Sequence, residues 1–251
     1  MGKIVAVVNQ KGGVGKTTTA VNLTAALAEA GKKVLLCDFD PQANATSGLG
    51  LDKRRIRHSV YDAVINSMPV DEIIVQTKFG DVLPATADLA GAAVELITMP
   101  EANFQLRRVL RSVADRYDVI LIDCPPSLEM LTINGLAAAD SILVPVQCEY
   151  YALEGLSDLM TTLRIVKKRI NPDLDIFGVV LTMFDGRTNF STQVAQEVRR
   201  HFPGKVFANV IPRNVRLAEA PSHGLPVMAY DRSSKGALAY TALAAEVIRK
   251  L

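Results

Sequence analysis

The sequence predicts an α/β fold with a doubly wound, mostly parallel sheet flanked by helices. Short apolar, β-branched runs alternate with helical patterns along nearly the whole chain. Most of these runs are apolar on both faces, as expected for parallel strands that are covered by helices. A glycine-rich turn joins the first run to the first helical pattern, which predicts a ligand at the carboxyl ends of the strands.

The expected elements follow this alternation. Strands are expected at 4–8, 34–37, 81–84, 119–123, 141–145, 177–182 and 206–210, and helices at 17–30, 60–66, 104–116, 155–170, 192–201 and 236–250. The first helix ends at Gly31, a residue suited to the position just past a helix. Because no repeat, low-complexity tract or linker interrupts the pattern, we expect one domain over residues 1–251.

Composition excludes several classes of protein. No apolar stretch approaches the roughly 18 residues that a membrane span needs, and the first apolar run is too short for a signal peptide. We therefore expect a cytoplasmic protein. Cys37, Cys124 and Cys148 lie in or beside apolar runs, which predicts reduced, buried thiols. With no C-x-x-C pair in the chain, an iron–sulfur cluster is not expected.

Charge is distributed unevenly although the net charge is only +2. Residues 1–159 carry 14 Lys and Arg against 19 Asp and Glu, whereas residues 160–251 carry 14 against 7. A basic C-terminal third is a candidate surface for a polyanion such as DNA. Solvated helix faces that happen to be rich in lysine and arginine would give the same count.

The glycine-rich turn has the composition of a phosphate-binding loop. Its backbone N–H groups and the following helix N-terminus would surround a nucleotide's phosphates. Lys16 would bridge the β- and γ-phosphates, and the Thr17 hydroxyl would bind Mg²⁺. A dinucleotide fingerprint does not fit, because a lysine and two threonines follow Gly15. The loop residues are Lys11, Gly12, Gly13, Val14, Gly15, Lys16, Thr17 and Thr18.

This loop departs from the common pattern G-x-x-x-x-G-K-[ST] in one informative way. Gln10 stands where the first glycine is expected, and a second lysine, Lys11, follows it. The sequence K-G-G-x-G-K-T-T resembles the deviant Walker A loop of the ParA/MinD family of ATPases. That resemblance implies that Lys11 reaches across a dimer interface to the partner's nucleotide. The alternative is that Lys11 contacts its own phosphates or solvent.

Two further acidic motifs follow buried strands. Asp38 and Asp40 occur in D-x-D-P-Q-x-N, which is similar to the family's second motif and implies that Asp40 holds the hydrolytic water. The alternative is a turn in which both carboxylates cap local N–H groups. Asp123 ends the run 119–123 as a Walker B aspartate, which would hold Mg²⁺. Residues 125–127 would then sense the γ-phosphate, again by resemblance.

The base is expected to be adenine. GTPases of this class usually read guanine with N-K-x-D, and no such tetrapeptide occurs in the chain. By resemblance, Thr182, Met183 and the segment 211–214, which includes Pro212 and Asn214, line the adenine pocket. ATP and Mg²⁺ are therefore the expected cofactors.

Residues 147–156 and 211–222 resemble the ParA/Soj chromosome-partitioning group more than the MinD group. In that group, DNA-binding arginines lie in a D-x-R-T-N loop and a P-R-N-V-R segment, which implies Arg187 and Arg216 here. Contacts to phosphates carry no sequence information, so DNA binding should be non-specific and salt-dependent. The alternative is that these arginines only pair with Asp185 or Glu219.

The resemblance implies a Mg²⁺-ATPase that forms an ATP-dependent homodimer on double-stranded DNA at the nucleoid. Hydrolysis would be weak alone and stimulated by a ParB/Spo0J-type centromere-binding protein. The chain departs from some members of the family in two ways. An N-terminal helix-turn-helix is not expected. Residues 243–251 lack a basic amphipathic membrane segment, so no membrane partner is expected. A MinD-like membrane-surface ATPase, a ParA-like positioner of other cargo and a dethiobiotin-synthetase-like ligase stay open as alternatives.

Overall fold

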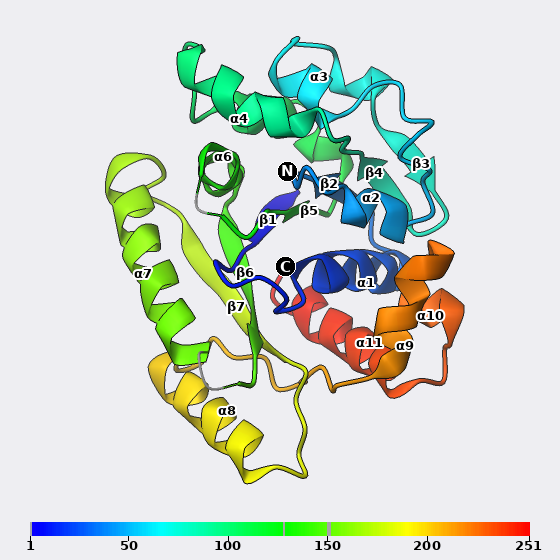
Figure 1. Cartoon of the computed structure of the whole chain (residues 1–251), viewed down its shortest axis with the longest axis vertical. Coiled ribbons are helices and arrows are strands. Elements are labelled where there is room, and N and C mark those ends of the chain that lie inside the picture. The colour runs from blue at the N-terminus through cyan, green and yellow to red at the C-terminus, as the bar shows by residue number, and fades with distance from the viewer. Residues whose placement is uncertain (1, 128, 150–151) are drawn as a thin grey trace.

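The computed structural model describes residues 2–127, 129–149 and 152–251. Over these residues the core is a seven-stranded sheet in the order β3-β4-β2-β5-β1-β6-β7 (Figure 1). All neighbouring pairs in this sheet are parallel except β3 and β4. The strands are β1 (Lys3–Val7), β2 (Val34–Asp38), β3 (Val75–Thr77), β4 (Gly80–Leu83), β5 (Val119–Asp123), β6 (Ser141–Gln147) and β7 (Asp175–Thr182). The predicted doubly wound α/β fold is confirmed.

Helices cover both faces of the sheet (Figure 1). They are α1 (Lys16–Glu29), α2 (Asn44–Gly48), α3 (Val60–Val64), α4 (Leu89–Thr98), α5 (Gln105–Arg111), α6 (Met130–Ala138), α7 (Ala152–Arg169), α8 (Asn189–His201), α9 (Val215–Glu219), α10 (Val227–Tyr230) and α11 (Lys235–Ile248), with short 3₁₀ turns η1 (Val70–Glu72), η2 (Ala114–Arg116) and η3 (Ala220–His223). On one face α1 and α11 pack together, and α3 to α8 cover the other.

The interior strand β1 shows why residues 4–7 are all apolar. Ile4 and Ala6 pack in the cluster under α3 to α8, whereas Val5 and Val7 pack in the cluster under α1 and α11. Each of residues 4–7 therefore leaves water on folding, and such burial is the main favourable contribution to stability. This burial on both faces explains the unbroken apolar run in the sequence.

The strand predicted at 206–210 is wrong. Val206 forms only an isolated bridge to β7. The backbone amides of Ala208 and Asn209 instead donate hydrogen bonds to the Glu246 carboxylate on α11, at 2.9 and 2.8 Å. Because a side chain takes the donors that a sheet would need, this segment leaves the sheet edge without becoming a strand.

The helix predicted at 104–116 is divided. It ends as α5 at Arg111, and η2 follows, whose Ala114 carbonyl accepts a hydrogen bond from the Gly2 amide (2.8 Å). The sequence also gave no expectation for α4, α6 or the antiparallel strand β3. In α6, Gly135 reads as a helix breaker, but a Cβ there would lie 2.7 Å from the Cys124 sulfur, so close packing requires glycine.

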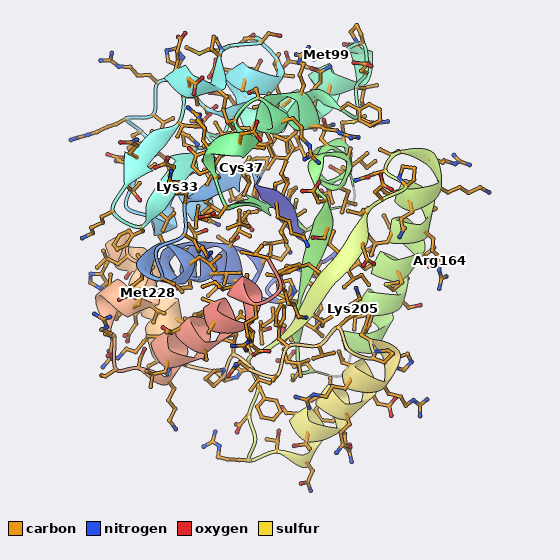
Figure 2. All side chains as sticks on the ribbon, turned by 180° about the vertical axis from the view of Figure 1, so that it is seen from behind. Lys33, Cys37, Met99, Arg164, Lys205 and Met228 are labelled. Atoms are coloured by element: carbon orange, nitrogen blue, oxygen red, sulfur yellow. The ribbon has the colours of Figure 1, made fainter. Side chains whose placement is uncertain are left out.

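The three cysteines are buried, and none of them forms a disulfide. Figure 2 shows Cys37 inside the molecule, viewed from behind. Burial raises the pKa of each thiol. The described residues contain no group of three or more His, Cys, Asp or Glu side chains arranged to hold a metal ion. None of the described helices combines the length and the hydropathy needed to cross a membrane.

Candidate nucleotide-binding site

The glycine-rich loop follows the carboxyl end of β1 and opens α1. Gly13 and Gly15 have left-handed backbone conformations, with φ of 76° and 91°, which L-residues with a Cβ rarely adopt. Gly15 is the N-cap residue of α1, and its carbonyl accepts the first helical hydrogen bond from Thr19 (2.9 Å). A Cβ built on Gly12 or Gly13 would meet no atom within 4 Å. The loop therefore offers open space beside the helix N-terminus, where an anion is favoured.

Lys16 is the first residue of α1 and is only 7% exposed. Its ammonium donates a hydrogen bond to the Lys11 carbonyl oxygen (3.1 Å), so the side chain spans the loop from inside. Burial lowers the pKa of Lys16, and the charges of Asp123, Cys124 and Asp40 act in the opposite direction. A buried cation inside a glycine-rich loop is placed to receive phosphate oxygens.

Two aspartates end neighbouring strands at the same register. Asp38 at the end of β2 pairs with Asp123 at the end of β5, and both side chains are fully buried. One Asp38 carboxylate oxygen accepts hydrogen bonds from the Thr46 amide and hydroxyl, each at 2.7 Å, and the other accepts one from the Asp40 amide at 3.3 Å. Burial still raises the pKa of Asp38 to about 6. Asp38 therefore holds the turn that carries Asp40.

Asp123 lies in a different environment. Neither of its carboxylate oxygens has a hydrogen-bond partner, although both are buried. Burial, followed by the charge of Asp38, raises the pKa of Asp123 well above its ordinary value, while Thr17 and Lys16 favour the charged form. A buried carboxylate without a donor is costly. Oxygen ligands are those that Mg²⁺ prefers, so the unpartnered Asp123 carboxylate beside the Thr17 hydroxyl fits this ion.

Asp40 is half-buried at the mouth of the loop. Its carboxylate accepts a hydrogen bond from the Gln42 amide (2.9 Å), which is the local turn that the sequence left open as an alternative. The same carboxylate is close enough to raise the pKa of Lys16. Asp40 is thus both a turn residue and a neighbour of the phosphate loop.

The residues expected to contact the base line one cavity of about 240 Å³ next to the loop. Met183, Pro212 and Asn214 lie there together with Gly15 and Thr18. Met183 has a positive φ of 50°, which is rare for a residue with a side chain. Such strain occurs most often at functional sites.

Two polar residues hold this cavity to the loop. Thr182 was expected there by resemblance, whereas sequence reasoning missed Tyr240. The Thr182 hydroxyl donates to the Val14 carbonyl (2.8 Å), and Tyr240 of α11 shares a hydrogen bond with Thr19 of α1 (3.1 Å). Both side chains are buried and both line the cavity. Thr182 ends a predicted strand, so its position was a usable signal. Nothing in the local sequence of Tyr240 indicates that it lies against α1.

Both candidate DNA-binding arginines are exposed and paired with carboxylates. The Arg187 side chain is 89% exposed and makes two hydrogen bonds to Asp185, at 2.9 and 2.7 Å. Arg216, on α9, pairs with Glu219 (2.7 Å) and Asp231 (3.3 Å). These pairs lower the pKa of Asp185 to about 2 and also lower that of Glu219. In this structure both arginines thus pair with the carboxylates named as the alternative to DNA, Asp185 and Glu219. An arginine in such an exposed pair can still contact a phosphate.

The two arginines lie on segments that border the base cavity. An isolated bridge joins Phe184 to Pro212, so the loop that carries Arg187 and the segment that leads to Arg216 run side by side. The Asn214 side chain also caps α9 by accepting a hydrogen bond from the Arg216 amide (3.0 Å). Tyr150 and Tyr151, in the segment 147–156 that carried part of the resemblance, lie outside the described residues.

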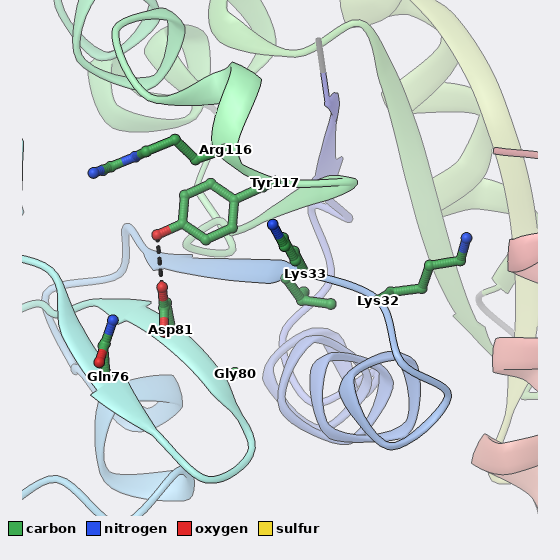
Figure 3. Close-up of a pocket in the computed structure, with 8 residues that line it drawn as sticks. Lys32, Lys33, Gln76, Gly80, Asp81, Arg116 and Tyr117 are labelled. Carbon is green, nitrogen blue, oxygen red and sulfur yellow. Dashed lines mark hydrogen bonds between the residues drawn. The ribbon is translucent and has the colours of Figure 1, made fainter.

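A second hollow lies at the opposite, amino ends of β2, β4 and β5 (Figure 3). There the Tyr117 hydroxyl donates to the Asp81 carboxylate (2.8 Å), and this contact together with burial raises the pKa of Tyr117. Figure 3 shows Lys32 and Arg116 directed away from each other, so their charges do not converge on one point. None of the residues that line this hollow belongs to the glycine-rich loop.

The loop, the buried lysine and the two strand-end aspartates define the class of P-loop nucleoside triphosphatases. A family model described as an AAA domain matches residues 2–176. The sporulation initiation inhibitor protein Soj of Bacillus subtilis is 57% identical over 249 residues, which are 98% of each chain. The chromosome partitioning protein ParA of Myxococcus xanthus is 52% identical, over 100% of this chain and 89% of that one. The chain belongs to the ParA/Soj family of chromosome-partitioning ATPases.

Among solved structures, cobyrinic acid a,c-diamide synthase from Mycobacterium smegmatis, with bound ADP and magnesium, is similar over most of its length. The TM-score is 0.87 at 38% identity, and the match covers 99% of this chain and 95% of that one. The P-loop ATPase fold expected from the sequence is therefore confirmed.

Proposed function

We propose that this protein is a Mg²⁺-dependent ATPase that binds DNA non-specifically as an ATP-sandwich dimer and leaves it after hydrolysis. The observation that carries the proposal is the buried, unpartnered Asp123 carboxylate beside the phosphate loop. Its cost to the fold is offset if a nucleotide-bound cation occupies the site. Membership of the ParA/Soj family supports a role in chromosome or plasmid partition.

In this proposal the loop binds the phosphates and adjoining residues complete the site. Backbone N–H groups of Gly12 to Thr18 surround the phosphates, and Lys16 exchanges its contact with the Lys11 carbonyl for phosphate oxygens. Thr17 and Asp123 hold Mg²⁺, which supplies positive charge to offset the charge that develops on the phosphates. Met183, Pro212 and Asn214 surround the adenine.

Hydrolysis requires a positioned water and a second cation. Asp40 orients the water, and its second carboxylate oxygen can do so while the first keeps the hydrogen bond from the Gln42 amide. Lys11 acts on the nucleotide of the partner protomer, so each site is complete only in the dimer. This incompleteness supports weak hydrolysis by the protein alone and stimulation by a ParB/Spo0J-type partner.

DNA binding is assigned to Arg187 and Arg216. Because phosphates are strong acceptors, they can replace Asp185 and Glu219 as the partners of these guanidinium groups. Exposed ion pairs of this kind are worth little, so the exchange costs little. Because it would bind DNA, we expect the protein to be associated with the nucleoid in the cytoplasm.

The test is the binding of a random-sequence duplex by Asp40→Ala, with ATP and separately with ADP, across a salt series. We expect tight binding with ATP alone, weakening steeply as the salt concentration rises because counterions are released from DNA. Arg216→Glu in the same background serves as the control and should lose most of this affinity. Absence of binding with either nucleotide, while ATP still drives dimerisation, would reject the DNA function.

The alternatives predict other ligands. A membrane-surface ATPase would bind liposomes instead of DNA, and a dethiobiotin-synthetase-like ligase would use ATP only in the presence of its organic substrate. A ParA-like positioner of other cargo would share both the ATPase and the DNA. The identity of its partner protein is what separates it from chromosome partition.

A further inference from the structure

The residue that replaces the first glycine of the loop has contacts of its own. Gln10 does not have a positive φ, unlike Gly13 and Gly15, so the backbone at this position does not require glycine. Its side-chain amide donates a hydrogen bond to the Thr162 hydroxyl of α7 (3.2 Å), which is 152 residues away in sequence. Both side chains are half-buried. Gln10 therefore ties the start of the loop to a helix on the other side of the sheet from α1.

Its neighbour Asn9 ties the same backbone to the sheet. Asn9 is 6% exposed, and its amide nitrogen donates to the Pro145 carbonyl of β6 (2.7 Å). Its amide oxygen accepts a hydrogen bond from the backbone amide of Lys11 (3.0 Å). In this nucleotide-free structure the carbonyl of Lys11 also accepts a hydrogen bond from the Lys16 ammonium. When Lys16 turns to the phosphates, the contact between Asn9 and the Lys11 amide is the one that still holds this backbone.

These contacts form a clamp, defined here as Asn9, Gln10 and Thr162, around the backbone that leads to Lys11. None of the three lies in the base cavity, and none is one of the loop residues expected to surround the phosphates. A long lysine side chain that must reach another protomer loses conformational freedom when it does so. Fixing its backbone in advance lowers that cost, which is the general benefit of preorganisation in binding.

We propose that Gln10, through its hydrogen bond to Thr162, is a positioning residue for Lys11 that promotes dimerisation around ATP. The ligand that Lys11 is positioned to meet is the nucleotide bound by a second copy of this chain. The inference rests on the proposed ATP-sandwich function and names a determinant of it outside the phosphate loop. Gln10 acts here through the backbone and makes no contact with phosphate.

The experiment compares Thr162→Val, which keeps the shape of threonine but removes the hydroxyl, with Thr162→Ser, which keeps the hydroxyl. Two quantities are measured: the affinity of the monomer for a fluorescent ADP, and the ATP-dependent dimerisation constant by sedimentation. We expect Thr162→Val to weaken dimerisation by about five-fold, the factor that one neutral hydrogen bond is worth. Affinity for ADP should be unchanged in both variants, and Thr162→Ser should dimerise like the parent.

Gln10→Ala and the double variant Gln10→Ala/Thr162→Val complete a double-mutant cycle. If the two residues act as one contact, the double variant should dimerise no more weakly than either single variant. Dimerisation of Thr162→Val at the parental level would overturn the inference. So would an equal loss of ADP affinity, which would indicate a general disturbance of the loop. A parent protein that stays monomeric with ATP would instead reject the sandwich function itself.

Discussion

Asp38 and Asp123 share a register at the ends of adjacent strands, yet their contacts are opposite. Asp38 accepts three hydrogen bonds, whereas Asp123 accepts none. Burial raises the pKa of both carboxylates, so both are costly to keep ionised in the folded state. Asp38 recovers part of that cost by organising the turn before Asp40. In the proposed function Asp123 recovers its cost when Mg²⁺ binds, so Asp38 has a structural role and Asp123 is assigned a functional one.

The same substitution at these two positions should therefore have opposite effects on the nucleotide-free protein. Asp38→Ala strands the Thr46 amide and hydroxyl and should lower the free energy of unfolding by roughly 1–3 kcal/mol. Asp123→Ala removes a buried carboxylate whose burial outweighs the favourable effects of Thr17 and Lys16, and it should leave that free energy unchanged or raise it. Chemical denaturation of the two variants and the parent measures the difference.

The pH dependence supplies the control for Asp123. A carboxylate whose pKa is raised on folding destabilises the protein at high pH, and this cost fades as the pH falls and the group is protonated. The advantage of Asp123→Ala over the parent should thus shrink as the pH is lowered from 8 towards 5. An advantage that is independent of pH, or a loss of stability equal to that of Asp38→Ala, would contradict the assignment.

Among the elements, β7 and the segment after it connect the base cavity to the candidate DNA surface. Asp185 follows β7 and neutralises Arg187, and Glu219 on α9 does the same for Arg216. A third pair joins Arg213 to Glu149 (3.2 Å). DNA phosphates must therefore compete with a carboxylate for each of these three arginines. We expect the acidic residues to lower the affinity of the protein for DNA.

Asp185→Asn tests this competition. Removing the negative charge should strengthen DNA binding in the ATP state by up to about five-fold at low salt, the range that an exposed ion pair can supply. Asp173→Asn is the matched control, because Asp173 is exposed and precedes the opposite end of β7. Weaker binding by Asp185→Asn would mean instead that Asp185 orients Arg187 for the phosphate.

The strands that could be predicted from the sequence were those whose residues are buried on both faces of the sheet. Six of the seven predicted strands are confirmed, and most of them are apolar on both faces. The segment 206–210 has the same composition, but the Glu246 side chain takes its backbone donors, and no local pattern reveals a contact 37 or 38 residues away. Helix α6 was not predicted, and the close packing of its Gly135 on Cys124 is visible only in the fold.

The site was predictable where one short segment supplies it. The loop residues and both strand-end aspartates are adjacent to recognisable strands, so their meeting at one edge of a parallel sheet follows from topology. Asn9 and Gln10 stand beside the motif, but their partners on β6 and α7 are 136 and 152 residues away. Such pairs cannot be read from periodicity, because each depends on how the sheet and helices pack.

In the molecule as a whole, the carboxyl edge of the sheet gathers the phosphate loop, the aspartates and the base cavity on one side. Lys11 and Asp40 border the same mouth, yet they are proposed to serve different nucleotides. Asp40 serves the nucleotide of its own protomer, and Lys11 serves that of the partner. A face-to-face dimer is the arrangement in which both roles are possible at once.

Mixing Lys11→Ala with Asp40→Ala tests this central claim most directly. Each variant alone should hydrolyse ATP very slowly, because every site lacks either the lysine or the aspartate. In the mixed dimer, one site regains both groups: Asp40 from the Lys11→Ala protomer and Lys11 from the Asp40→Ala protomer. The account predicts ATP hydrolysis by the mixture well above the sum of the two variants, and a rate equal to that sum would contradict it.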